Sequence, residues 1–308
     1  MGKGERNDSE CEKGVGGKEK MRITNNQGLP QAIVDAVDTF HRGGDYSASM
    51  LTKSPRQVWL ERRHDDEMVQ DVSEMVWALF GTAVHFIIQR GDNENRLTEE
   101  YLTAEVAGKR LSGFCDVYED GEIADWKTTS VWSYIFMDNE KRFEYESQLN
   151  AYAYLFRKYG FKVHKLTIVM LFRDWQKSKA KYDPQYPQSQ VQKMDIKLWS
   201  VEEQERYLTE RIQMFEQYKD TPDEQLPYCS LSYRWATASK WALMKDGRKS
   251  AIKLYDTEAE ALNASKDDTK LYVQERPGEQ FKRCEYCNAR PWCNQYQEAH
   301  GDTDSDKS

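Results

Sequence analysis

Two aspartates in a predicted β-hairpin are the residues of this sequence best suited to chemistry. Alternating segments flank Asp120-Gly121, a dipeptide typical of two-residue hairpin turns. In the register that such a turn sets, Asp116 lies directly opposite Asp125. Two carboxylates that face each other across a ladder lie roughly 4.5–5.5 Å apart and repel one another. The pair therefore predicts a bound cation, and oxygen ligands together with a substrate phosphate favour Mg²⁺ or Mn²⁺.

Lys127 follows Asp125 by two residues, so the alternation of side chains along a strand puts both on one face. A lysine beside a metal–carboxylate pair can orient the attacking water and stabilise charge that develops on a phosphate. The backbone carbonyl of Trp126 could complete the metal shell, while its indole would point to the opposite, core face. A solvent-facing strand with an Asp–Lys pair gives the same spacing without chemistry, but the cross-strand Asp116 favours a site.

Three further side chains are predicted to lie at this site. His85 lies in a helix predicted over 72–90, and a neutral imidazole is a competent metal ligand. Gln148 and Tyr152 lie four residues apart in a helix predicted over 141–158, so they share a face and could hold a substrate strand against the metal. A histidine satisfied in the core and an ordinary polar helix edge are the alternatives.

The elements that position these residues follow the order helix, three-strand meander, helix, strand, which is an α/β pattern. The helix over 72–90 is apolar on most faces and is therefore expected to be buried. Strands are expected at 97–106, 111–118, 122–128 and 163–172, and helices at 55–68, 72–90, 141–158 and 201–219.

Four motifs occur in the order and spacing of RecB-type nucleases: Gly81-Thr-Ala-Val-His85, Gly113-x-x-Asp116, Asp125-Trp-Lys127-Thr128 and Gln148-x-x-x-Tyr152. The sequence between about residues 46 and 175 therefore resembles the PD-(D/E)xK superfamily. It looks most similar to the phage and bacterial exonucleases of that superfamily.

The resemblance implies a restriction-endonuclease-like core with a Mg²⁺ or Mn²⁺ ion. It implies that His85, Asp116 and Asp125 are metal ligands and that the lysine of the third motif is the catalytic lysine. The glutamine and tyrosine of the fourth motif would support the site or the DNA strand. An acidic residue on the first strand, Glu99 or Glu100, is implied to assist.

The function that follows is a metal-dependent DNA exonuclease of phage or bacterial DNA recombination or repair. Its partner would be DNA, and a single-strand annealing protein or a recombinase is a further candidate. One alternative is an endonuclease of the restriction type. Another is a catalytically silent DNA-binding recombination accessory protein, against which the intact Asp116, Asp125 and Lys127 argue.

Four cysteines predict a second metal site. Cys284-x₂-Cys287-x₅-Cys293 supplies three thiolates, and Cys229 is the best candidate for a fourth. The spacing resembles the iron–sulfur staple at the C-terminus of many RecB-type and CRISPR-associated nucleases. In those proteins the first ligand usually precedes the core, whereas this chain has no cysteine between residues 12 and 114. A 4Fe–4S cluster is expected ahead of zinc or of free thiols.

The C-terminal part of the sequence predicts a small ββαβ module with a Cys-rich end. Asp246-Gly247 joins two strand-like runs, a helix opens near Asp256, and another strand follows at 271–275. The predicted organisation is a flexible tail at 1–28, a PD-(D/E)xK nuclease core at 29–225, the ββαβ module at 226–296 and an acidic flexible tail at 297–308.

Composition limits the class of protein. Of 308 residues 39% are hydrophobic and 31% charged, and the mean hydropathy is -0.89, so no membrane span is expected. The formal net charge of -8 shows no overall basic surface for DNA, although a local basic cleft is compatible with it. Six cysteines without a secretory signal are expected to be reduced, which predicts the cytoplasm of a bacterial cell or of a phage-infected host.

Overall fold

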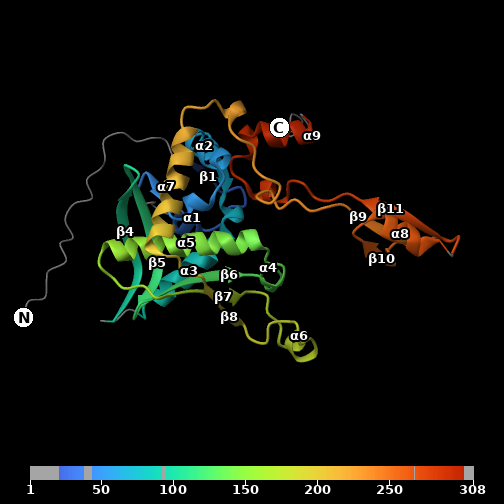
Figure 1. Ribbon diagram of the computed structural model, residues 1–308, viewed down its shortest axis with the longest axis horizontal. Helices are drawn as coiled ribbons and strands as arrows, with labels where there is room; N and C mark the ends of the chain where they lie inside the picture. Colours follow the sequence, from blue (N-terminus) through green and yellow to red (C-terminus); the bar gives the residue numbers. More distant parts are fainter. Residues whose placement is uncertain (1–20, 38–43, 92–94, 267, 302–308) are drawn as a thin grey trace, which may run out of the picture.

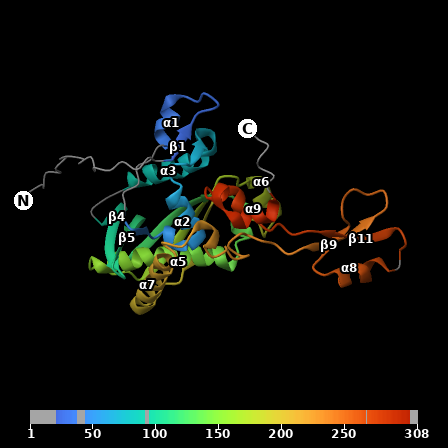
Figure 2. The same cartoon turned by 90° about the horizontal axis from the view of Figure 1, so that it is seen from above.

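The computed structural model describes residues 21–37, 44–91, 95–266 and 268–301. The chain is mixed α/β, with a six-stranded central sheet flanked by helices and a three-stranded sheet at the end of two extended segments (Figure 1). Helices α5 and α7 lie on one face of the central sheet, and α1 and α3 lie on the other (Figure 2).

The central sheet contains a β-meander of β4, β5 and β6, which is part of the predicted fold. Its strands are β2 (Tyr46–Ser47), β4 (Arg96–Val106), β5 (Lys109–Glu119), β6 (Glu122–Thr129), β7 (Lys165–Phe172) and β8 (Val191–Ile196). The helices around it are α1 (Gln31–Val37), α2 (Pro55–Arg63), α3 (Val76–Gln89), α4 (Val131–Ile135), α5 (Asn139–Lys158), α6 (Lys177–Tyr182) and α7 (Val201–Gln217).

Two tight turns fix the register of the meander. Ala107-Gly108 and Asp120-Gly121 all have positive φ values, as both central residues of a type I′ turn must. The second turn confirms the predicted register: Glu119 pairs with Glu122, Tyr118 with Ile123 and Val117 with Ala124.

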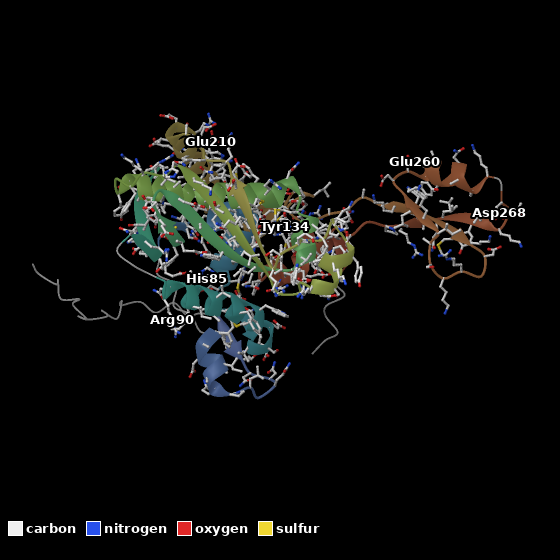
Figure 3. The ribbon with its side chains drawn as sticks, turned by 90° about the horizontal axis from the view of Figure 1, so that it is seen from below. His85, Arg90, Tyr134, Glu210, Glu260 and Asp268 are labelled. Atoms are coloured by element: carbon white, nitrogen blue, oxygen red, sulfur yellow. The ribbon has the colours of Figure 1, made fainter. Side chains whose placement is uncertain are left out.

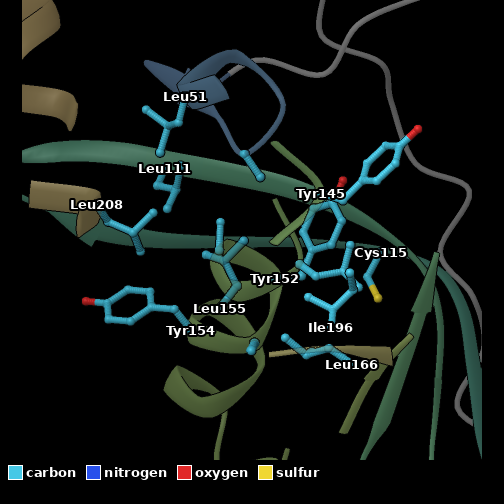
Figure 4. Packing of buried hydrophobic residues seen from close by; sticks show 14 of the residues in the cluster. Leu51, Leu111, Cys115, Tyr145, Tyr152, Tyr154, Leu155, Leu166, Ile196 and Leu208 are labelled. Carbon is cyan, nitrogen blue, oxygen red and sulfur yellow. The ribbon is translucent and has the colours of Figure 1, made fainter. Parts of the chain in front are cut away.

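Helix α5 forms the largest part of the core against the sheet. The Asp138 side chain caps its first turn by accepting a hydrogen bond from the Lys141 amide. Leu149, Leu155 and Phe156 are completely buried, and Figure 4 shows the packing around Leu155. Because α7 packs on its outer side, α5 lies between α7 and the sheet.

Helix α3 does not have the burial that its apolar sequence predicts. None of its residues is buried, and four of its large apolar side chains are more than half exposed: Trp77, Phe80, Phe86 and Ile87. The helix contacts β4 and β6 of the sheet and the short helix α1, and these contacts leave the four side chains largely uncovered in the described chain. Gly81 lies against the sheet, where a Cβ would be 3.7 Å from Thr128 Oγ1.

The predicted tails are shorter than expected where the structure describes them. Arg22–Thr24 forms β1, which pairs in parallel with β3 (Val69–Asp71), because Asp71 accepts hydrogen bonds from Thr24 Oγ1 and the Asn26 amide. At the other end α9 (Asn294–His300) enters the predicted acidic tail, and the His300 ring stacks on Tyr296. Residues 1–20 and 302–308 lie outside the described part of the chain.

The C-terminal module has the expected ββαβ order but not the expected hairpin. It consists of β9 (Lys240–Lys245), β10 (Lys253–Tyr255), α8 (Glu258–Ser265) and β11 (Leu271–Arg276), with β9 central. Lys253 pairs with Leu243, so a long loop replaces a two-residue turn at Asp246-Gly247. The Asp246 amide bonds to the Lys270 carbonyl instead, which directs the chain toward β11.

Among the helices of the described residues, none is both long and apolar enough to cross a membrane.

A histidine between α2 and the C-terminal segments predicts a pH dependence of stability. His64 pairs with Glu67 and Asp223 and stacks on Trp292. Burial lowers its pKa, but the two carboxylates outweigh burial and leave the pKa above its ordinary value. The contribution of these two ion pairs to the free energy of unfolding is therefore complete below about pH 6.5 and is lost as the pH rises through the folded-state pKa of His64.

We expect the free energy of unfolding of the wild type, relative to His64→Gln, to fall by up to about 1 kcal/mol between about pH 5.5 and about pH 8.5. Urea unfolding at both pH values measures this difference. An equal difference at the two values would contradict the pairing.

Candidate functional site

The site lies where two strands of the meander separate. β5 pairs with β6 only as far as Val117 and Ala124, whereas β6 continues along β7 up to Thr129. Further along β5, β2 pairs with Leu111 and Ser112. A fork therefore opens between β5 and β6, and Asp116 and Asp125 lie at its apex.

The predicted ladder pair of Asp116 and Asp125 is not formed, because the ladder ends one pair earlier. The Asp116 carboxylate instead reaches across the fork, and its Oδ2 accepts a hydrogen bond of 2.7 Å from the Trp126 amide. Both aspartates are nevertheless buried, at 6% and 2% exposure. The two carboxylates lie at the same fork, but with a geometry that a regular ladder does not give.

His85, Glu99 and Asp116 form a group that could hold a metal ion. One ligand atom from each lies within 4.8 Å of the others. His85 Nδ1 is 2.9 Å from Glu99 Oε1 and 3.5 Å from Asp116 Oδ1. Figure 3 shows His85 on α3, which brings the imidazole to the sheet. Two carboxylates and an imidazole suit a divalent cation of the Mg²⁺ or Mn²⁺ type.

The electrostatics of Asp116 also favour a cation. Burial, followed by the charge of Asp125, raises the pKa of Asp116 to about 7, although His85, the Trp126 amide and Lys127 act in the opposite direction. A buried carboxyl with that pKa takes up either a proton or a metal ion near neutral pH. A divalent cation would therefore keep this carboxylate ionised.

Asp125 lies outside that group and pairs with Lys127. Lys127 Nζ is 2.6 Å from Asp125 Oδ2, yet this buried oxygen has no hydrogen-bond partner of good geometry. Burial lowers the pKa of Lys127, but the charge and hydrogen bond of Asp125 and the charge of Asp116 together outweigh burial and leave the pKa above its ordinary value. The lysine is therefore charged, and Asp125 Oδ2 keeps capacity for a further cation.

The predicted substrate residues are brought together beside the carboxylates. Gln148 Nε2 donates a hydrogen bond of 2.8 Å to Tyr152 Oη. Burial, and then the charges of Asp125 and Asp116, raise the pKa of Tyr152 well above its ordinary value. Tyr152 therefore stays a neutral hydroxyl next to the site.

Gly113 of the second motif makes room for Tyr152, because a Cβ at this position would lie 2.9 Å from the tyrosine ring. We expect Gly113→Ala to lower the free energy of unfolding by about 1–3 kcal/mol, as overpacking of a core does. Urea unfolding measures the loss. Unchanged stability of Gly113→Ala would contradict the close approach.

Glu99, and not Glu100, is the acidic residue of the first strand that reaches the site. The Ala107-Gly108 turn places Glu99 opposite Asp116 in the β4–β5 register. Glu99 has a φ of 54°, which interrupts the ladder and turns its side chain toward His85. The Ala107-Gly108 dipeptide is visible in the sequence. With it as a two-residue turn, the register would have placed Glu99 opposite Asp116.

The four predicted cysteine ligands line one small cavity of about 30 Å³, with Cys229 from the segment before β9 and Cys284, Cys287 and Cys293 from the C-terminal end. Burial raises the pKa of each of three thiols, to about 11 for Cys284 and about 12 for Cys287. Without a cation these cysteines are therefore thiols at neutral pH. A bound metal would supply the positive charge that thiolates need.

The four thiols do not form a compact group of donor atoms. In the described part of the chain, three or more donor atoms within 4.8 Å of one another are found for the His85 group and not for these thiols.

Comparisons with known proteins identify no family for this chain. No family model matches the chain, and no curated protein sequence does. Among solved structures, the crystal structure of SSO0001 matches with a TM-score of 0.42 and 16% sequence identity, covering 61% of this chain and 87% of that chain. At that level of similarity the match does not bear on function.

Proposed function

We propose that this chain is a metal-dependent DNA exonuclease with a core of the PD-(D/E)xK type. The observation that carries the proposal is the fork between β5 and β6. Four elements, α3, β4, β5 and β6, bring two buried aspartates, a lysine, a histidine and a glutamate to that point. Three of the four sequence motifs in the order of RecB-type nucleases supply the histidine, the aspartates and the lysine, and of the two acidic candidates on the first strand it is Glu99 that joins them.

The donor set fits a hard divalent cation. His85, Glu99 and Asp116 would hold it, and the unsatisfied Oδ2 of Asp125 is available to it on the other side of the fork. The Trp126 carbonyl stays a predicted ligand. When bound, the cation would stabilise the negative charge that develops on the phosphate.

The remaining residues have distinct roles in hydrolysis of a phosphodiester bond. Lys127 carries the positive charge that orients the attacking water and stabilises the phosphate oxygens. Tyr152 stays protonated, so its hydroxyl can donate to a phosphate of the bound strand while Gln148 orients it. DNA is the proposed partner, together with an annealing protein or a recombinase, and the cytoplasm is the proposed location.

At the Cys-rich end we propose a 4Fe–4S cluster on Cys229, Cys284, Cys287 and Cys293. Their place around one cavity supports a shared metal site, and the sequence spacing of Cys284, Cys287 and Cys293 favours an iron–sulfur cluster. The buried Arg234, whose Nε has no hydrogen-bond partner, lines the same cavity and favours a group with net negative charge.

Lys127→Ala tests the role that distinguishes this site from a simple metal site. We expect turnover of linear DNA to fall by on the order of a hundredfold or more, because a charge aimed at the phosphate is removed. Mn²⁺ binding by calorimetry should persist, since the lysine is not a ligand. Loss of Mn²⁺ binding would show that the lysine shapes the metal site, and retained turnover would remove it from the chemistry.

A further inference from the structure

Tyr145 of α5 lies between two ammonium groups, one of which belongs to the proposed nuclease site. Its ring centroid is 5.9 Å from Lys127 Nζ and 4.9 Å from Lys141 Nζ. The side chain is buried in the core next to Tyr152, as Figure 4 shows. The face of an aromatic ring attracts a cation, more strongly where water is excluded. Lys127 therefore has two attractive partners, the Asp125 carboxylate and this ring.

Glu144, the residue before Tyr145, holds one cation on each carboxylate oxygen. Oε2 is 2.8 Å from Lys141 Nζ, and Oε1 is 2.6 Å from Arg283 Nη1. Burial raises the pKa of Glu144, but Lys141 and Arg283 outweigh burial and leave the pKa below its ordinary value. The carboxylate is thus ionised and shielded from solvent, so both pairs are screened little by salt.

Arg283 connects this helix to the cavity of the four thiols. It precedes Cys284 in the chain and lines the cavity itself. Its guanidinium lies 3.9 Å from the Tyr233 ring centroid, which fixes its direction toward α5. A continuous set of contacts thus runs from the Cys-rich end to the fork through Arg283, Glu144, Lys141, Tyr145 and Lys127.

We propose that Tyr145 is a positioning residue for Lys127, and that Arg283 keeps Tyr145 in place through Glu144 and Lys141. Lys127 needs a second partner because its 2.6 Å pair with Asp125 Oδ2 draws the ammonium onto an oxygen that is proposed to face the metal. The ring offers a second attraction that competes with this pair for the ammonium. The inference rests on the proposed function and makes the Cys-rich end a support of the site.

The test uses Tyr145→Phe, Tyr145→Leu, Arg283→Gln and the double variant Tyr145→Leu/Arg283→Gln in the full chain. Tyr145→Phe keeps the ring and should keep wild-type kcat. Tyr145→Leu should lower kcat about tenfold, with KM nearly unchanged, because a cation–π contact of this kind is lost. Arg283→Gln should lower kcat by less, and the double variant should be no slower than Tyr145→Leu alone, since both act on the same lysine.

A matched control is Lys109→Gln, which breaks a 2.8 Å pair with Glu216 between β5 and α7, away from the fork. It should leave kcat unchanged. Independent effects of Tyr145→Leu and Arg283→Gln that multiply in the double variant would overturn the proposal, as would wild-type kcat in Tyr145→Leu.

A second measurement needs no activity and no metal. In protein labelled at lysine, the ring of Tyr145 should shift the NMR signals of the Lys127 ε-methylene, assigned with Lys127→Arg. The shift should persist in Tyr145→Phe, vanish in Tyr145→Leu and change in Arg283→Gln. If the wild type does not cleave DNA but the Lys127 signals change in the variants as expected, the proposed function fails and the positioning of Lys127 by Tyr145 stands. If Arg283→Gln leaves the Lys127 signals unchanged, the connection to the Cys-rich end is wrong.

Discussion

Asp125→Asn is expected to abolish cleavage of DNA, by on the order of a thousandfold or more, while the fold and DNA binding persist. Asp125 is almost fully buried at the apex of the fork, and its Oδ2 has no hydrogen-bond donor of good geometry. Asparagine keeps the shape of the side chain but removes the charge that a cation and Lys127 share. The rate of release from end-labelled DNA in Mg²⁺ measures the loss.

Asp195→Asn is the matched control for this variant, because Asp195 is an exposed aspartate of the same sheet whose pair with Lys165 is long, at 3.8 Å. It should cleave at the wild-type rate. Circular dichroism and fluorescence anisotropy with DNA should be the same for both variants. Robust Mg²⁺-dependent cleavage by Asp125→Asn would remove this residue from the site.

Cys287→Ser is expected to release the metal of the Cys-rich end and to loosen residues 281–300. The segment is built of short turns around Cys284 and Pro291, so thiolate ligation would provide much of its stability. Wild-type protein purified without oxygen should be brown and contain iron, and the variant should be colourless. Absorption spectra, elemental analysis and hydrogen exchange of this segment measure the three effects.

Cys115→Ala is the control, since Cys115 is buried in the core and does not line the thiol cavity. It should keep the iron. Colourless wild-type protein with stoichiometric zinc would replace the cluster by zinc but keep the metal staple. Neither metal in anaerobically prepared protein would contradict the site as a whole.

The meander and its site residues were predictable because their determinants are local. Asp120-Gly121 sets one register, and periodicity identifies α5 and with it the shared face of Gln148 and Tyr152. What the sequence does not contain is the end of the ladder at Val117, because the fork depends on where β2 and β7 hold their neighbours. For that reason the sequence predicts Asp116 opposite Asp125 and not against the Trp126 amide.

Two other differences arise from tertiary context. The apolar sequence of α3 predicts burial, but exposure is decided by what packs against the helix, and its contacts with α1, β4 and β6 leave much of its apolar surface uncovered in the described chain. The Asp246-Gly247 turn predicts a tight hairpin, but the Asp246 amide finds the Lys270 carbonyl, a partner far along the sequence. Local turn propensity is weaker than a long-range hydrogen bond combined with the pairing of β11 on β9.

The most direct test of the central claim is incubation of the wild-type chain with linear and covalently closed circular duplex DNA of the same sequence, with Mg²⁺ and with a chelator. A metal-dependent exonuclease should degrade the linear DNA from its ends only in Mg²⁺ and should leave the closed circle intact. Cleavage of the circle would identify an endonuclease. Binding of both forms without any Mg²⁺-dependent cleavage would contradict the proposed function.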